Sequence, residues 1–109
     1  MSLNLPQPLS AYFAADRGDD AEALARCFTD DAVVTDEGHT YTGLAAIKRW
    51  RAAAQAKYTY TSEPFALTKE GGKVIVTSKL KGNFPGSPVD LRYIFELEGE
   101  KISSLEIIP

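Results

Sequence analysis

The chain has 109 residues, of which 44% are hydrophobic and 25% are charged, and its formal net charge is −3 at pH 7. This length suits one domain spanning residues 1–109 with a single core. A net negative charge provides no global attraction to nucleic acid, and no apolar run approaches the roughly 20 residues that a membrane-spanning helix needs. We therefore expect neither nucleic acid nor a membrane as a partner.

The expected location follows from two further features of the sequence. The N-terminal segment has neither the basic region nor the long apolar region of a secretory signal. The single cysteine, Cys27, cannot form a disulfide bond within the chain. Both features fit a reducing compartment, so we expect the protein to be cytoplasmic.

Helical spacing dominates the first part of the chain. Apolar residues recur at this spacing in the first predicted helix: Leu5, Leu9, Tyr12 and Phe13. That helix is expected to end at Gly18. A second helix is predicted to begin at Asp19, which can cap it, with Glu22 three residues later as in a capping box. The apolar stripe of the second helix is predicted to extend to Phe28.

A strand and a third helix are predicted next. The β-branched run at residues 32–35 predicts the strand. Thr42 can cap a helix from about Gly43 to Ala56, and its apolar face holds Ala46, Ile47, Trp50 and Ala54. The basic residues of this helix are expected on its solvent side: Lys48, Arg49 and Arg51.

The second half alternates with a period of two, which is typical of strands. Strands are predicted at 57–62, 73–82, 89–98 and 101–108, with a Pro- and Gly-rich loop at 83–88. The predicted order is therefore α-α-β-α-β-β-β-β. Helices followed by strands predict an α+β fold, with helices on one face of a strongly bent antiparallel sheet.

At this level of detail the chain resembles the nuclear transport factor 2-like (cystatin-like) superfamily, and most closely its SnoaL-like branch. The resemblance is carried by "RGDDAEALARCFTDDAVVTDEGHTYTGLAAIKRW" and by the last hairpin, "LRYIFELEGEKISSLEI". It implies a cone of helices and sheet that encloses a pocket, and a homodimer formed through the outer face of the sheet. Because this fold hosts cyclases, isomerases, hydrolases and non-catalytic binders, it does not fix the function.

Asp36 is the first candidate catalytic residue. It follows the predicted strand at 32–35, where ketosteroid isomerase, similar in fold, carries its general base; that enzyme is a worked example of such chemistry. The resemblance therefore implies that Asp36 could remove a proton next to a carbonyl group. The alternative is a turn carboxylate that binds amides of its own loop.

The resemblance leaves the groups that would stabilise the resulting anion open. Tyr12 lies near the position of the isomerase tyrosine. For the second acid, Asp90 is the nearest candidate, but alignment from the last hairpin places Arg92 there instead. Arg92 alternates with Tyr93, so it enters the pocket only if the strand presents that face inward.

His39 is the only histidine and the only side chain here with an ordinary pKa near neutrality. It could assist Asp36 as a proton carrier. In an extended segment the two side chains would point to opposite faces, so they meet only if the chain turns at Gly38. The alternative is a solvent-facing loop histidine.

The remaining candidates would bind a substrate by packing and hydrogen bonding. They are Trp50, Tyr60, Phe84 and Tyr93, together with Tyr12 and Arg92. Plain core packing is the alternative for the aromatic residues. We expect no cofactor and no metal, because no ligand spacing such as HxxxH or CxxC is present. Cys27 lies beside an apolar helix stripe, which favours a buried structural thiol.

Three functions remain open from these residues. The first is an enzyme that acts on a small, largely apolar molecule, with Asp36 as base, His39 assisting, and Tyr12 or Arg92 stabilising the anion. The second is a non-catalytic binder of the same kind of molecule. The third is a protein-interaction module whose interior is filled by its own side chains.

Overall fold

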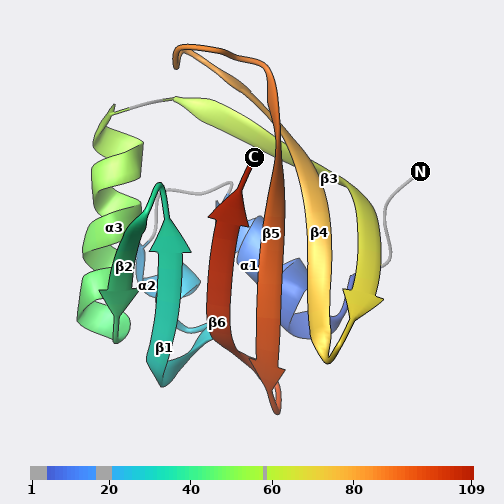
Figure 1. Cartoon of the computed structure of the whole chain (residues 1–109). Coiled ribbons are helices and arrows are strands. Elements are labelled where there is room, and N and C mark those ends of the chain that lie inside the picture. Colours follow the sequence, from blue (N-terminus) through green and yellow to red (C-terminus); the bar gives the residue numbers. More distant parts are fainter. Residues whose placement is uncertain (1–4, 17–20, 58) are drawn as a thin grey trace.

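The computed structural model describes residues 5–16, 21–57 and 59–109, and within them it contains three helices and one six-stranded sheet (Figure 1). The helices are α1 (Gln7–Asp16), α2 (Ala21–Ala25) and α3 (Leu44–Lys57). The strands are β1 (Phe28–Asp36), β2 (His39–Thr42), β3 (Tyr60–Glu70), β4 (Lys73–Gly82), β5 (Val89–Glu98) and β6 (Lys101–Ile108). The predicted helix end at Gly18 and the predicted cap at Asp19 lie outside the described residues.

The sheet is open and mixed, with the strand order β2-β1-β6-β5-β4-β3. All neighbouring strands run antiparallel except β1 and β6, which run parallel. The prediction of a wholly antiparallel sheet was therefore wrong at this one pair. β6 must run antiparallel to β5 to complete the last hairpin, and this direction makes it parallel to β1.

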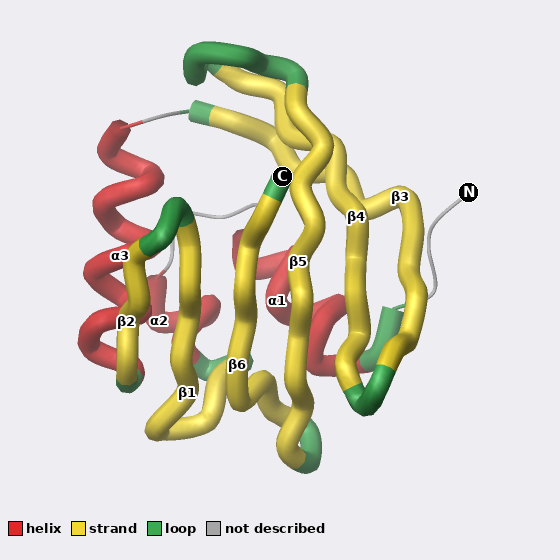
Figure 2. The backbone as a smooth tube through the Cα atoms, viewed as in Figure 1, coloured by secondary structure: helices red, strands yellow, loops and turns green. Residues whose placement is uncertain are grey.

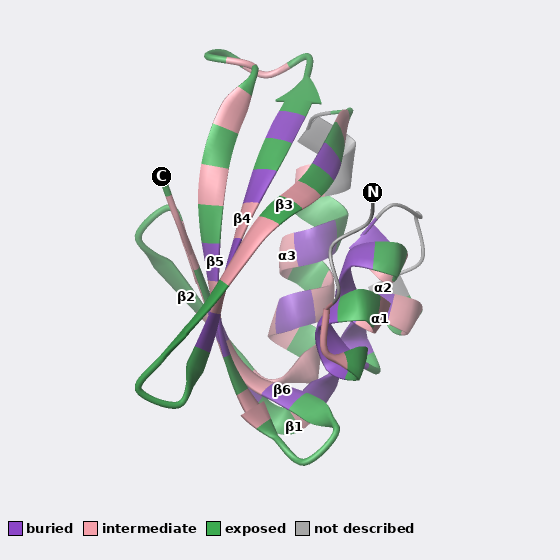
Figure 3. Ribbon diagram, turned by 90° about the vertical axis from the view of Figure 1, so that its right-hand side faces the viewer, coloured by how far each residue is buried: buried purple, intermediate pink, exposed green. Residues whose placement is uncertain are grey.

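The helices lie together on one face of the bent sheet, as Figures 2 and 3 show. This arrangement confirms the predicted α+β class with a two-layer architecture. On β4 the alternation is regular: Val74, Val76, Ser78 and Leu80 are buried, and the residues between them are more exposed. The strand pairing places Val76 opposite Tyr93, so Tyr93 also faces the helices. We call this the inner face of the sheet.

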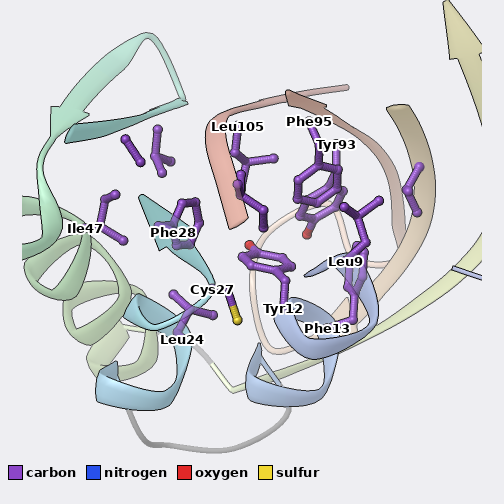
Figure 4. Packing of buried hydrophobic residues seen from close by; sticks show 14 of the residues in the cluster. Leu9, Tyr12, Phe13, Leu24, Cys27, Phe28, Ile47, Tyr93, Phe95 and Leu105 are labelled. Carbon is purple, nitrogen blue, oxygen red and sulfur yellow. The ribbon is translucent and has the colours of Figure 1, made fainter. Parts of the chain in front are cut away.

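The core lies between the three helices and the inner face of the sheet (Figure 4). Tyr12 contacts four rings edge-on, with centroid distances of 5.1 Å to Phe13, 5.9 Å to Phe28, 6.3 Å to Tyr93 and 5.5 Å to Phe95. Edge-to-face packing of this kind adds to the stabilisation that burial alone provides. Leu9, Tyr12 and Phe13 of the predicted first-helix stripe are therefore confirmed as the core-facing side of α1, whereas Leu5 lies before the helix and packs against the core.

The largest departure from prediction is the hairpin of β1 and β2. Residues 37 and 38 both have positive φ, 52° for Glu37 and 78° for Gly38, as a two-residue type I′ turn requires. The chain therefore folds back at once, and Asp36 pairs directly with His39. The sequence left a turn at Gly38 open and did not predict the second strand, because Glu-Gly is a weaker turn signal than Asn-Gly or Asp-Gly.

β1 also begins earlier than predicted. Phe28, expected on the second helix, is its first residue and pairs with Ile102 of β6. The backbone of Cys27 links α2 to the sheet. Its N–H donates a hydrogen bond to the Leu24 carbonyl oxygen, and its own carbonyl oxygen accepts one from the Ile102 N–H. Pairing with a strand distant in sequence thus overrides the local helical spacing.

None of the helices in the described part of the chain has the length and apolar character that a membrane span requires.

Candidate functional site

Asp36 lies at the end of β1 on the inner face of the sheet. The pairing with β6 places it beside Ile107, which itself lies opposite the buried Tyr93. Its Oδ2 accepts a hydrogen bond from Nε1 of Trp50 on α3, 3.0 Å away. Burial raises the pKa of the Asp36 carboxyl, and the Trp50 bond opposes this effect. Asp36 is thus a half-buried carboxylate, directed toward the interior.

His39 reaches the same face as Asp36 because of the turn at Gly38. The two residues are cross-strand partners, so their side chains lie on one face of the hairpin. His39 is exposed, however, whereas Asp36 is half-buried. A charge on His39 has only a small lowering effect on the Asp36 pKa, below those of burial and Trp50. The geometry brings the pair together but leaves His39 at the solvent boundary.

Arg92 and Asp90 lie on the opposite face of the sheet. Tyr93 and Phe95 are buried on the inner face, so the alternation of β5 turns residues 90 and 92 outward. Arg92 is exposed, and its Nε and Nη2 donate to the Pro109 carbonyl oxygen at 3.2 and 3.0 Å. The prediction that Arg92 contacts a ligand in the interior is therefore wrong, and Asp90 cannot act there as a second acid either.

The predicted aromatic residues are placed in different surroundings. Tyr12 and Tyr93 are 1% and 3% exposed and belong to the core cluster. Trp50 is half-buried, with its ring centroid 6.2 Å from that of Tyr41 on β2. Phe84 is half-buried in the β4–β5 loop and packs against the core. Asp36, Trp50 and Tyr41 therefore form one side of the interior.

A buried ion pair, not anticipated from the sequence, lies between α1 and α3. Nη1 of Arg51 is 3.1 Å from Oδ1 of Asp16, and both side chains are about 95% buried, at 5% and 6% exposure. Nη2 of Arg51 also donates to the Asp16 carbonyl oxygen. The sequence prediction placed Arg51 in solvent, which is wrong. Nη1 further donates a short hydrogen bond to the hydroxyl of Tyr60, on β3.

Two serines continue this polar lining across the sheet. Ser62 of β3 and Ser78 of β4 are 6% and 0% exposed, and their hydroxyl oxygens are 2.6 Å apart. Burial raises the pKa of Tyr93 and the Asp16 charge raises it further, while the hydroxyl of Ser62 acts in the opposite direction. Asp16, Arg51, Tyr60, Ser62, Ser78 and Tyr93 are called the inner polar cluster below.

The spacing of Asp16 and Arg51 contains a signal for this pair. Asp16 comes four residues after Tyr12 and seven after Leu9, so it continues the apolar stripe of the first helix. Arg51 comes four residues after Ile47, on the buried side of the third helix. Opposite charges on two core-facing stripes could have predicted the pair. Ser78 likewise is a polar residue among the apolar buried positions of its strand.

The β4–β5 loop is tied to the start of β3. The Thr59 N–H donates to Asn83 Oδ1 at 2.9 Å, and the Asn83 N–H donates to the Thr59 carbonyl at 3.1 Å. Within the loop, the Gly82 N–H donates to Ser87 Oγ at 2.9 Å. These bonds favour a rigid turn over residues 83–88.

With this geometry established, comparison with known proteins identifies the family. The SnoaL-like domain matches residues 9–105. The chain belongs to the SnoaL-like family. No protein with a curated description matches the sequence.

Solved structures agree with this family and fold. A candidate polyketide cyclase from Sinorhizobium meliloti is 45% identical to this SnoaL-like chain over 94% of both chains, with a TM-score of 0.90. A hypothetical protein with a ketosteroid isomerase-like fold from Catenulispora acidiphila, in complex with trimethylamine, is 24% identical over 97% of this chain and 87% of that one (TM-score 0.85). A cystatin-fold protein from Novosphingobium aromaticivorans is 21% identical over 97% and 100% (TM-score 0.76). The family and fold expected from the sequence are confirmed.

Proposed function

We propose that this SnoaL-like domain binds a small, largely apolar molecule between α3 and the inner face of the sheet, and that Asp36 acts on it as a general base. The observation that carries this proposal is the half-buried carboxylate at the end of β1, held by Trp50 and directed toward the interior. A base of this kind is most effective when its pKa is shifted toward the operating pH, and burial shifts Asp36 in that direction.

The proposed reaction class is removal of a proton from a carbon next to a carbonyl group, as in an isomerase or a cyclase. A carboxylate can accept such a proton without a cofactor, and the carbonyl oxygen then carries the negative charge. The similarity to a candidate polyketide cyclase supports this class, because polyketides are rich in such carbons. His39, across the turn from Asp36 at the solvent boundary, is placed to pass the proton outward.

The test is exchange of hydrogen for deuterium in a simple ketone. The rate of exchange at the carbons beside the carbonyl of 2-tetralone, in deuterated water, is followed by NMR with wild type, Asp36→Asn and Asp30→Asn. Asp30 is the matched control because it is an exposed aspartate on the same strand. We expect wild type and Asp30→Asn to accelerate exchange, and Asp36→Asn to lose about 10²–10⁴-fold of that acceleration.

The same experiment separates catalysis from binding. Equal acceleration by wild type and Asp36→Asn would contradict the role of Asp36. Ligand-observed NMR that detects binding of 2-tetralone without any exchange would favour the non-catalytic alternative. Where exchange occurs, its rate should increase with pH as Asp36 loses its proton, with a midpoint above the ordinary aspartate pKa of 3.8.

A further inference from the structure

We propose that Tyr60 donates a hydrogen bond to an oxygen atom of the bound molecule, and that the buried Arg51–Asp16 pair holds Tyr60 for this purpose. The proposal rests on the proposed function, because it requires a ligand in the same interior. It narrows the ligand class to apolar ring systems with a carbonyl, enolate or phenolic oxygen.

The first step is the direction of the Arg51–Tyr60 hydrogen bond. A guanidinium group has donors and no acceptor, so Arg51 must be the donor and the Tyr60 oxygen the acceptor. The single hydroxyl proton of Tyr60 is then directed to some other group. Among the described residues, no acceptor for this proton is found. The hydroxyl of Tyr93 differs in this respect, because its hydrogen-bond partner Ser62 has a hydroxyl that can either donate or accept the bond.

The second step is the environment of the Tyr60 hydroxyl. Residues 60 and 62 share a face of β3, and the pairing of Ser62 with Leu80 identifies it as the inner face. Burial raises the pKa of Tyr60, so the phenol keeps its proton at neutral pH and remains a donor. The Asp16 charge raises the Tyr60 pKa further, Arg51 lowers it, and the Asp36 charge adds a smaller increase. Base and donor therefore face the same interior from different strands.

The third step is the rigidity of Tyr60. The Arg51 guanidinium carbon lies 5.5 Å from the centroid of its ring, and Arg51 is itself fixed by Asp16. At the backbone, Gly82 approaches so closely that an added Cβ would be 2.7 Å from Tyr60 Cβ and 2.3 Å from the Thr59 carbonyl oxygen. A donor held in place from both sides needs no reorganisation to bind an oxyanion.

The buried pair of Asp16 and Arg51 also affects the chemistry of Tyr60. A buried ion pair usually stabilises a protein no more than a well-packed apolar pair would. Stability alone is therefore a weak reason for the presence of Asp16 and Arg51. Their arrangement does have a chemical effect. A phenol that accepts from a cation becomes a stronger donor, and it binds a negative oxygen better than a neutral one. This suits an oxygen that gains charge when Asp36 removes a proton.

Two probes of nearly equal shape, 2-naphthol and naphthalene, test the proposal. Their dissociation constants are measured by fluorescence or ligand-observed NMR for wild type, Tyr60→Phe and Thr61→Val. Thr61 is the control, because its hydroxyl lies on the exposed face of the same strand, away from the interior. We expect wild type and Thr61→Val to prefer 2-naphthol, and Tyr60→Phe to lose about tenfold of that preference while binding naphthalene unchanged.

A second readout distinguishes donation from a purely structural role. The absorbance of bound 2-naphthol reports whether it is protonated, and wild type should lower its pKa relative to Tyr60→Phe. If Tyr60→Phe keeps both the preference and this pKa, the Tyr60 proposal is wrong although the proposed function stands. If wild type binds neither probe, the proposed function fails and the Tyr60 proposal fails with it.

Discussion

The β1–β2 hairpin and the inner polar cluster place polar side chains at the interior in two different ways. Asp36 and His39 are three residues apart, and a two-residue turn brings them together near solvent. Asp16 and Arg51 are 35 residues apart, on different helices, and are almost fully buried. The hairpin is therefore a local arrangement whose groups can exchange protons with water. The cluster is a long-range arrangement whose groups depend on one another.

The largest expected effect follows from breaking the buried pair. Arg51→Met should lower the free energy of unfolding by about 3–5 kcal/mol, because the Asp16 carboxylate then loses its buried cation. The double variant Asp16→Leu/Arg51→Met should regain most of this loss, since neither charge of the pair remains. Urea unfolding measures both.

An exposed ion pair is the control for this comparison. Nζ of Lys48 is 2.7 Å from Oε1 of Glu22, and the two side chains are 37% and 62% exposed. Lys48→Met should therefore lower the free energy of unfolding by about 1 kcal/mol or less. An Arg51→Met loss no larger than that of Lys48→Met would show that the cluster is not the interdependent unit described above.

The next effect concerns the contact that holds Tyr60. Gly82→Ala places a methyl group within 2.7 Å of Tyr60 Cβ, so β3 and β4 must separate locally. We expect a loss of about 1–3 kcal/mol in the free energy of unfolding. Lys81→Ala, exposed on the same strand, should change it by about 0.5 kcal/mol or less. Equal melting temperatures for the two variants would contradict the tight contact at Gly82.

The difference between local and long-range arrangements also separates what the sequence could predict from what it could not. Local periodicity correctly indicated the helices and most strands, because these depend on neighbouring residues. It failed for Phe28, where pairing with Ile102 determines the structure, and for the face of Arg92, which depends on the neighbouring strands. Arg51 was predicted to face solvent because of its charge, although its position four residues after Ile47 places it on the buried side of the third helix.

A smaller effect tests the turn of the hairpin. Glu37 has a φ of 52°, a left-handed conformation that costs a residue with Cβ roughly 1–2 kcal/mol but that asparagine adopts readily. Glu37→Asn should therefore raise the free energy of unfolding by about 1 kcal/mol or less. Glu70→Asn is the control, because Glu70 precedes a turn without having a positive φ itself. Thermal unfolding that ranks Glu70→Asn as equally stabilising would exclude strain at Glu37.

The smallest effect separates the functional from the structural role of Asp36. Its pKa is raised in the folded state, mainly by burial, so the native protein binds a proton that the unfolded chain releases. The free energy of unfolding should then decrease as the pH rises from the ordinary value of 3.8 to the raised value, because the native state binds more protons in that window.

Asparagine has no such proton, and its Oδ1 can still accept the bond from Trp50. Asp36→Asn should consequently be as stable as wild type or more stable at neutral pH, by roughly 0.5 kcal/mol or less. This advantage should shrink as the pH falls through the window. Urea unfolding of both proteins across this pH range measures it, with Asp30→Asn as the control for removing an exposed charge. A carboxylate kept mainly for stability would give the opposite sign, because its loss would destabilise the protein most at neutral pH. The sign of one difference in stability therefore decides whether the hairpin carries Asp36 at a cost to the fold, as a catalytic base would require, or for the benefit of the fold.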